Sequence, residues 1–373
     1  MKVSVNELRI NPEDKDSVIK TLDAGWFSSA GPVIPEFETS WANYCNREYG
    51  VAVSNGSTAL LAAFLSLKLP PGSEVIIPNF TIISCANAVI QSGLKPVFVD
   101  CELGTFNIDP DKIEERISPK TRAILIVHIY GHPSDVGKIK QIAEHFNLLI
   151  VEDSAEAHGA KYLDADKNWK VCGTELDLST FSFFANKLIT TGEGGMILTD
   201  NETYARELQS IRNLYFPQDR DYFHSEIGYQ FRLSSLQAAY GMPQIKRIDK
   251  ILERKGLINR RYRENLKNCE HLRFTTESSY VKANYWVIPV LVNPEILSSQ
   301  EFRQKLIEKD IETRPFFTGM NKQPALLNCL IGDNYEFPNS TLVHEQGVIL
   351  PSGINTSDEQ IDYVCEVITH IML

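Results

Sequence analysis

Between residues 74 and 152 the chain carries four short apolar runs: EVIIP at 74–78, PVFVD at 96–100, AILIV at 123–127 and LLIVE at 148–152. Helical patterns separate these runs, at 82–91, near 111–117 and at 136–145. Apolar runs that are bounded by Gly, Pro and Asp and separated by helices are typical of βαβ units. The sequence therefore predicts an α/β fold with a mostly parallel sheet that helices cover on both faces.

The pattern changes after Gly241. Residues 243–266 form a charged helical stretch rich in Arg and Lys, and a smaller mixed region follows it to Leu373. We therefore place a domain boundary near residue 248. Residues 1–247 are expected to form a large domain that includes the N-terminal segment and a sheet of the seven-stranded type, and residues 248–373 a small α+β domain.

Charge and cysteine content exclude several classes of protein. The 373 residues carry 37 Lys and Arg against 48 Asp and Glu, a net charge of −11. This charge repels a phosphate backbone, so we expect no nucleic-acid partner. The apolar runs are far shorter than a membrane span, which indicates a cytoplasmic protein without a membrane segment. The seven cysteines form no CxxC pair, so reduced thiols and no metal site are expected.

Residues 54–59, SNGSTA, enter a helical pattern at 59–67. Small residues and hydroxyl groups at a helix N-terminus can form a phosphate-sized anion site. The alternative is a simple helix cap made by Ser or Thr. A nucleotide loop of the Walker or dinucleotide type is excluded because GK[ST] and GxGxxG spacings are missing.

Two further segments carry reactive side chains. VEDSAEAHG at 151–159 directly follows an apolar run, so Asp153 is expected at the edge of the sheet, where a carboxylate can hold a ring nitrogen in its protonated state. In STFSFFANK at 179–187, Lys187 has an aromatic setting suited to Schiff-base chemistry. Each alone has an ordinary alternative, a solvated acid or a surface lysine. Together with the phosphate site, they are the parts that hold pyridoxal phosphate (PLP).

In order and spacing, these segments resemble the fold-type I, PLP-dependent aminotransferases that act on nucleotide-linked sugars. The resemblance runs from GWFSS at 25–29 to LPS at 350–352, and TTGEGGM at 190–196 is its most specific part. It implies transfer of an amino group from L-glutamate to C4 of a 4-keto-6-deoxy sugar on a nucleoside diphosphate. Within the family, VHIYGHP at 127–133, FSFFANK at 181–187 and TTGEGGM at 190–196 are most similar to the members that form GDP-perosamine. The resemblance therefore implies GDP-4-keto-6-deoxymannose as substrate and GDP-perosamine as product, for a surface polysaccharide such as the O-antigen of lipopolysaccharide.

The resemblance also implies residue roles. Lys187 would bind the cofactor covalently and then shuttle a proton, Asp153 would pair with the pyridinium nitrogen, and Glu156 would lie near the ring hydroxyl. The expected cofactor-binding set is Gly56, Ser57, Thr58, Ile82, Asp153, Glu156, Ser182, Lys187 and Gln230. The expected substrate-binding set is Ser29, His128, Arg220, Tyr222, His224, Arg232 and Arg314. For His128, packing beside the cofactor is an equal alternative.

In this family a segment of the neighbouring subunit completes the site. The matching stretch runs from RDYFH at 220–224 to GYQFR at 228–232, which implies an obligate homodimer with shared active sites. Ile82 and Gln230 depart from the family pattern, since an aromatic residue is usual at the first position and Asn at the second. A third departure is TGMN at 318–321, which differs from the Tyr-Pro-Met-His of the perosamine-forming members and so bears on the identity of the sugar.

Several alternatives remain open at this stage. The same chemistry on a UDP- or dTDP-linked keto sugar, at C4 or C3, is one. A non-catalytic PLP-binding protein is another, although Lys187 and both carboxylates are present. Relatives that deoxygenate sugars carry His where this chain has Lys187, so transamination is favoured. A nicotinamide-dependent dehydrogenase is disfavoured by the missing GxGxxG fingerprint.

Overall fold

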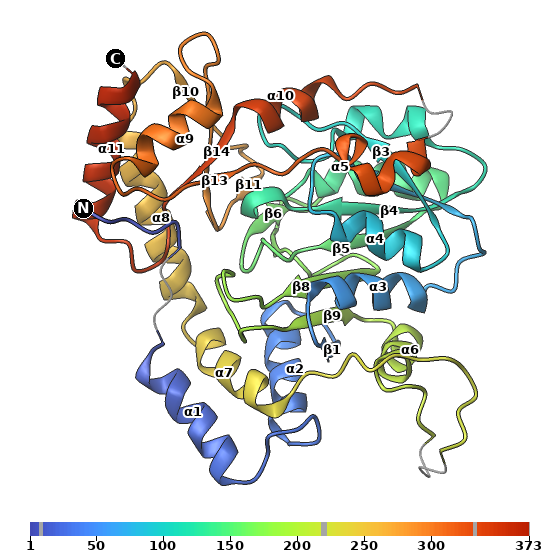
Figure 1. The fold of residues 1–373 in the computed structure, drawn as a ribbon. Helices are drawn as coiled ribbons and strands as arrows, with labels where there is room; N and C mark the ends of the chain where they lie inside the picture. Colours follow the sequence, from blue (N-terminus) through green and yellow to red (C-terminus); the bar gives the residue numbers. More distant parts are fainter. Residues whose placement is uncertain (7–9, 218–221, 331–333, 373) are drawn as a thin grey trace.

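The computed structural model describes residues 1–6, 10–217, 222–330 and 334–372 (Figure 1). Its strands are β1 (Tyr49–Val53), β2 (Glu74–Pro78), β3 (Lys95–Val99), β4 (Thr121–Val127), β5 (Leu149–Asp153), β6 (Lys161–Leu163), β7 (Trp169–Val171), β8 (Leu178–Ser182), β9 (Gly195–Thr199), β10 (Leu272–Phe274), β11 (Val281–Lys282), β12 (Ile288–Val292), β13 (Arg314–Pro315) and β14 (Gly347–Leu350). Its α-helices are α1 (Pro12–Asp23), α2 (Val33–Tyr44), α3 (Gly56–Ser66), α4 (Ser84–Gln91), α5 (Val136–Phe146), α6 (Glu202–Arg212), α7 (Ser235–Ile245), α8 (Ile248–Asn265), α9 (Ser299–Ile307), α10 (Pro338–Gln346) and α11 (Asp358–Met372).

The main sheet has seven strands in the order β1-β9-β8-β5-β4-β2-β3. The pairs from β3 through β2, β4 and β5 to β8 are parallel, whereas β9 pairs antiparallel with both β8 and β1. All four apolar runs of the sequence are strands of this sheet, β2 to β5. The prediction of an α/β fold with a mostly parallel sheet is confirmed.

Alternation along the buried strands explains how both faces of the sheet are covered. In β2, Val75 and Ile77 pack in a core with α3 and α4, whereas Ile76 packs in a second core with Ile139 and Ile142 of α5. Successive side chains of a strand point to opposite faces, so an uninterrupted apolar run serves both cores. Figure 1 shows α3 and α4 on one face of the sheet.

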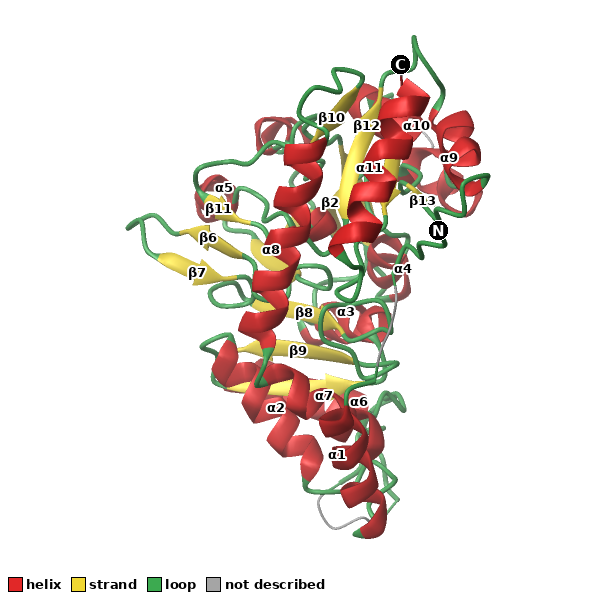
Figure 2. Ribbon diagram, turned by 90° about the vertical axis from the view of Figure 1, so that its left-hand side faces the viewer, coloured by secondary structure: helices red, strands yellow, loops and turns green. Residues whose placement is uncertain are grey.

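A second sheet, in the order β10-β12-β14-β13, is antiparallel and packs with α8, α9 and α11 (Figures 1 and 2). Val3 lies in this core, and its backbone bridges to Ile311. The first residues therefore pack on the C-terminal part of the chain, not on the large sheet to which we assigned the N-terminal segment. A third, three-stranded sheet in the order β11-β6-β7 joins the two parts of the chain.

Two helical expectations differ from the structure. The stretch near 111–117 forms two 3₁₀ turns, Pro110–Lys112 and Glu114–Arg116, instead of one α-helix, and Pro119 disfavours helical backbone at Ser118 just after them. The long helix expected over 243–266 is interrupted between α7 and α8, where Arg247 leaves the helical region with φ −113° and pairs with Asp14. Among the described residues, no helix is long and apolar enough to cross a membrane.

Candidate active site

The N-terminus of α3 forms a backbone cradle at the edge of the main sheet. Asn55 caps the helix: its Oδ1 accepts from the backbone N–H of Thr58 at 2.9 Å, and its own N–H donates to Thr58 Oγ1 at 3.1 Å. The N–H groups of Gly56 and Ser57, in the first turn, remain available to an anion. A Cβ built on Gly56 would lie 2.7 Å from Ser182 Cβ, so only glycine allows this close approach to the end of β8.

Of the expected phosphate-binding residues, Gly56, Ser57 and Ser182 therefore lie together, as the proposed cofactor site requires. Thr58 has a different role, because its hydroxyl is used within the cap. It accepts from the Asn55 N–H and donates to the Asn55 carbonyl oxygen at 2.8 Å. Thr58 thus shapes the cradle without offering it a free hydroxyl.

Asp153 ends β5 and is 2% exposed. Its Oδ1 accepts from the Ala155 N–H at 3.0 Å, and its Oδ2 accepts from the Cys85 thiol at 3.5 Å. Burial raises the pKa of Asp153, which means that the folded protein disfavours its charge. A protonated ring nitrogen placed beside this carboxylate would supply the missing cationic partner, so Asp153 fits the pyridine ring of PLP.

Lys187 and Glu156 form a close pair of opposite charges in the candidate site. Lys187 Nζ lies 3.6 Å from Glu156 Oε1, and only 11% of the lysine side chain is exposed. Glu156 Oε2 accepts from the Tyr130 N–H at 2.8 Å, a contact made with Tyr130 in the left-handed region at φ 55°. Burial raises the pKa of Glu156, and the neighbouring Lys187 opposes this rise.

Helix α4 links the phosphate cradle to Asp153. Ser84, its first residue, lies with its Oγ 2.8 Å from Ser57 Oγ, and Cys85 donates to Asp153. Ile82 stands just before this helix and is 42% exposed. The expected aliphatic contact of Ile82 with the cofactor ring, in place of aromatic stacking, stays a prediction.

Two residues of the site were not found from the sequence. The Trp286 ring lies 3.9 Å from Lys187 Nζ, and its indole N–H donates to the Asn186 carbonyl oxygen at 2.7 Å. This cation–π contact holds the lysine side chain from the side of the small sheet. The sequence predicts a reduced thiol for Cys85 but does not predict its contact with Asp153. Neither residue stands in a motif, since only the folded chain brings them to Lys187 and Asp153.

The expected contact of His128 with substrate is wrong. His128 is fully buried; its Nδ1 accepts from the Ser134 N–H at 3.0 Å, so Nε2 carries the ring proton and donates to Glu152 at 2.7 Å. Both nitrogens are therefore used inside the protein. His128 therefore packs inside the protein, which was the alternative interpretation.

His128, Glu152 and Cys172 also place their donor atoms within 4.8 Å of one another, a spacing that a metal ion could use. Hydrogen bonds account for the arrangement instead. Glu152 accepts from His128, from Ser179 Oγ at 2.5 Å and from the Gly173 N–H at 2.9 Å. Although burial opposes its charge, these bonds hold the pKa of Glu152 below its ordinary value. Burial raises the pKa of the Cys172 thiol, which makes it a poor ligand.

The segment expected to reach a neighbouring subunit lies on the surface of this chain. Tyr222 is 79% exposed, and the exposed His224 approaches the Leu214 carbonyl oxygen through its Nδ1 at 2.7 Å. Gln230 Oε1 accepts from the Arg232 Nε–H at 2.9 Å. Arg220 lies outside the described residues. The chain alone does not bring these side chains to Lys187.

Ser29 and Arg314 are also not joined to Lys187 by any contact that the structure shows. Ser29 lies in the loop between α1 and α2, and Arg314 is exposed on β13. The residues after β13 do approach the site: the Phe317 N–H donates to the Tyr130 hydroxyl at 3.3 Å, and the Phe317 ring stacks on Tyr130 at 5.3 Å. Tyr130 thus connects this segment to Glu156.

This grouping of an anion cradle, a buried acid and a shielded lysine at one edge of an α/β sheet fits a PLP-dependent enzyme. The model of the DegT/DnrJ/EryC1/StrS aminotransferase family matches residues 8–369, and this chain belongs to that family. It is 36% identical over 365 residues to a protein of Escherichia coli O157:H7 named GDP-perosamine synthase, across 98% of this chain and 97% of that protein.

Two further comparisons agree with the family. A protein of Aneurinibacillus thermoaerophilus named dTDP-3-amino-3,6-dideoxy-alpha-D-galactopyranose transaminase is 33% identical over 364 residues, across 97% of this chain and 96% of that protein. The crystal structure of S. venezuelae DesV in complex with a ketimine intermediate superposes with a TM-score of 0.88 at 28% identity, covering 96% of this chain and 94% of that one. The chain is a PLP-dependent aminotransferase of sugar nucleotides.

When bound, PLP supplies an electron-withdrawing ring that stabilises negative charge on the carbon that exchanges its amino group. Gly56, Ser57 and Ser182 would hold its phosphate, and Asp153 would keep its ring nitrogen protonated. Lys187 is the base that would accept and return the proton at that carbon. In the chain without cofactor, Glu156 and Trp286 hold the Lys187 ammonium from two sides, so the position of this group is set before the cofactor binds.

Proposed function

We propose that this chain transfers the amino group of L-glutamate to C4 of GDP-4-keto-6-deoxymannose and releases GDP-perosamine. The observation that carries the proposal is the shielded Lys187 between Glu156 and Trp286, with Asp153 buried nearby. A lysine at this position can serve both covalent and proton-transfer roles, whereas a histidine serves only the second. The relative named GDP-perosamine synthase supports the choice of sugar, and a role in surface polysaccharide synthesis would follow from it.

The residues at 318–321 are the ones we assign to recognition of the sugar. This segment lies at the carboxyl edge of the main sheet, because Asn79, directly after β2, fixes it: the Met320 N–H donates to the Asn79 carbonyl oxygen at 2.8 Å, and the Asn321 N–H to Asn79 Oδ1 at 2.9 Å. Ligands bind at this edge of an open α/β sheet. The departure from the family pattern at 318–321 therefore bears on the sugar and leaves the cofactor site unchanged.

The first measurement is the visible absorbance of the purified protein with PLP. L-Glutamate is expected to bleach the band of the lysine-bound cofactor, and GDP-4-keto-6-deoxymannose is expected to restore it, because the two half-reactions move the amino group in opposite directions. A band that bleaches but returns only with another nucleotide sugar would overturn the assignment of the sugar alone. If no such band forms with PLP, the assignment of Lys187 as the residue that binds the cofactor covalently is wrong.

A dTDP- or UDP-linked keto sugar, aminated at C4 or C3, is the second candidate. It is supported by the relative named as a dTDP-3-amino-3,6-dideoxy-alpha-D-galactopyranose transaminase, whose identity of 33% is close to that of the first relative. The three nucleotide sugars should therefore be tested side by side at equal concentration in the same absorbance experiment.

We also propose that the enzyme is a homodimer whose active sites take residues from both subunits. Phe223 and Ile227 are 83% and 93% exposed, close to the exposed Tyr222. Large apolar side chains exposed together on one segment indicate a contact surface. The backbone of this segment is anchored beside the cradle, since the Ser54 N–H donates to the Phe231 carbonyl oxygen at 2.7 Å.

Mixing two inactive variants tests the shared site. One is Lys187→Ala and the other carries Tyr222→Ala with Phe223→Ala. If each site combines the lysine of one subunit with the segment of the other, random exchange restores about one quarter of the wild-type activity, because half of the dimers hold one intact site. If every site belongs to a single subunit, the mixture stays inactive. A Tyr222/Phe223 variant with full activity would contradict any role of this segment.

A further inference from the structure

One buried side chain binds the backbone of both residues that contact the Lys187 ammonium. Asn284 lies between β11 and β12 and is 2% exposed. Its amide nitrogen donates to the carbonyl oxygens of Glu156 at 2.9 Å and His158 at 3.1 Å, and its amide oxygen accepts from the Trp286 N–H at 2.9 Å. The side chains of Glu156 and Trp286 lie against the lysine ammonium. Asn284 therefore connects these two contacts through a single planar group.

The loop after β4 fixes Asn284 from a third direction. The Asn284 backbone N–H donates to the Gly131 carbonyl oxygen at 3.1 Å. A Cβ built on Gly131 would lie 1.8 Å from Asn284 Oδ1, and Gly131 has φ 83°, so only glycine allows this approach. The preceding residue, Tyr130, donates its N–H to the Glu156 carboxylate. This loop thus holds the carboxylate of Glu156 while Asn284 holds its backbone.

The three bonds of the side chain match an amide group. Two carbonyl oxygens need donors and one N–H needs an acceptor, and asparagine presents both kinds of group. A side chain without them would leave buried backbone groups unpaired, which is costly unless the backbone moves. Glu156 follows β5 of the main sheet, whereas Trp286 lies just before β12 of the second sheet. Asn284 thus joins the two parts of the chain beside the lysine.

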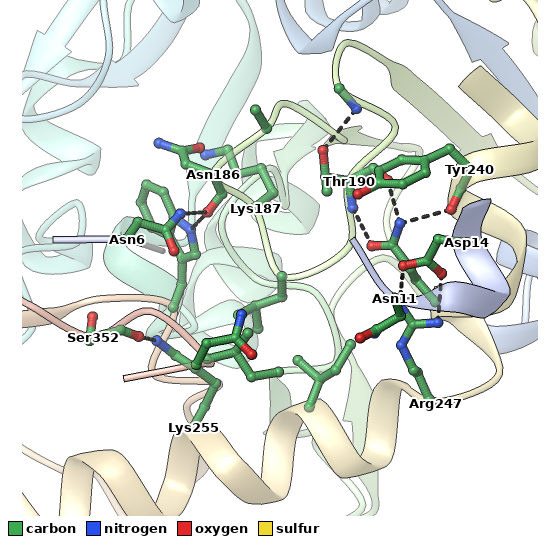
Figure 3. A pocket seen from close by; sticks show the side chains of 18 residues that line it. Asn6, Asn11, Asp14, Asn186, Lys187, Thr190, Tyr240, Arg247, Lys255 and Ser352 are labelled. Carbon is green, nitrogen blue, oxygen red and sulfur yellow. Dashed lines mark hydrogen bonds and ion pairs between the residues drawn. The ribbon is translucent and has the colours of Figure 1, made fainter. Parts of the chain in front are cut away.

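We propose that Asn284 is a positioning residue for the chemistry at Lys187. Its amide sets the place of Glu156 relative to Trp286. These two residues in turn set the place of the lysine ammonium, which lies next to Asn186 at the wall of a cavity (Figure 3). The inference rests on the proposed role of Lys187 and does not depend on which sugar is the substrate. A displacement of about 1 Å in a reacting group can lower a rate by about 100-fold.

Asn284→Ala is expected to lower the limiting rate of the glutamate half-reaction by about 10- to 100-fold. The L-glutamate concentration that gives half of this rate should change less than about threefold. The PLP-loaded protein is mixed with L-glutamate, and loss of the cofactor band is followed. Asn284→Asp should retain more activity, because a buried carboxyl group takes up a proton and can then donate to one carbonyl oxygen while it accepts from the Trp286 N–H. This variant also serves if the alanine protein does not fold.

The fluorescence emission of Trp286 in the cofactor-free protein is a readout that does not depend on activity. It is the difference between each protein and the same protein with Trp286→Phe. Asn284→Ala should shift this emission, because it removes the bond to the Trp286 N–H. In the Trp286→Phe protein, Asn284→Ala should lower the limiting rate by a smaller factor than in wild type, since part of its effect passes through the ring.

Asn107→Ala is the matched control. Asn107 is 1% exposed and makes the same three kinds of bond elsewhere. It donates to the carbonyl oxygens of His132 at 3.0 Å and Pro133 at 3.2 Å, and it accepts from the Ile129 N–H at 2.8 Å. Asn107→Ala should lower the melting temperature about as much as Asn284→Ala does. It should keep the limiting rate within about threefold of wild type and leave the Trp286 emission unchanged.

An equal loss of rate in the Asn107 and Asn284 variants would overturn the proposal, because the loss would then come from loosening of buried loops in general. A lower melting temperature of Asn284→Ala with an unchanged limiting rate would overturn it as well, whether or not the emission shifts. If Lys187→Ala keeps its turnover, the proposed function falls and this inference falls with it. The lysine variant therefore tells a failure of the proposed function from a failure of the positioning role alone.

Discussion

Replacement of Lys187 by alanine is expected to lower kcat by a factor on the order of 10⁴ or more, because one substitution removes the covalent attachment and the proton carrier together. The contacts of the lysine ammonium in the described part of the chain are the Glu156 carboxylate at 3.6 Å and the Trp286 ring, and neither can form a Schiff base. The measurement is single-turnover conversion of the PLP-loaded protein by L-glutamate.

Two controls separate chemistry from folding in this experiment. A small primary amine such as ethylamine should restore part of the activity of Lys187→Ala, since it fits the space left by the side chain and carries a proton as the lysine does. Trimethylamine should not. Lys187→His should keep the fold and lack covalent attachment. Unchanged turnover in Lys187→Ala would refute the assignment of the whole site.

The grouping of the candidate cofactor-binding residues at one edge of the sheet could be predicted from the sequence, because these residues directly follow or precede strands. Asp153 ends β5, Ser182 ends β8, and Gly56 begins the helix after β1. In a parallel sheet the carboxyl ends of the strands share one edge, so sequence order fixes the approximate position of these residues. The strands could also be predicted, because an uninterrupted apolar run of about five residues can be buried on both faces of a parallel sheet.

The rest depended on contacts that have no sequence signature. Trp286 reaches Lys187 from the other part of the chain, and Cys85 reaches Asp153 from the start of α4. His128 follows β4 at a position where a side chain could point into the cleft or into the core. Its hydrogen bond to the buried Glu152 holds it in the core.

Asp153→Asn is expected to reduce kcat by about 10²–10³-fold, the cost typical of losing one preorganised electrostatic contact. Asparagine keeps the shape and can still accept from the Ala155 N–H, but it cannot stabilise a protonated ring nitrogen. Cofactor binding should weaken less than turnover, because the phosphate cradle and Lys187 remain. Asp153→Glu restores the charge at the wrong distance and serves as the second variant.

Asp153→Asn should not destabilise the cofactor-free protein. The melting temperature of this variant therefore separates a role of Asp153 in catalysis from a role in holding the fold. Burial raises the pKa of this carboxyl, so the folded state binds its proton more tightly than the unfolded state does. The resulting cost is absent below the ordinary pKa of about 4, grows as pH rises from there to the raised folded value, and stays constant above it. Asp153→Asn removes the cost, so at pH 7 the cofactor-free variant should melt at the same temperature as wild type or higher. At pH 4 the gain should shrink. A cofactor-free variant that melts well below wild type at pH 7 would show that Asp153 holds the fold, and the loss of activity would then say nothing about the ring nitrogen.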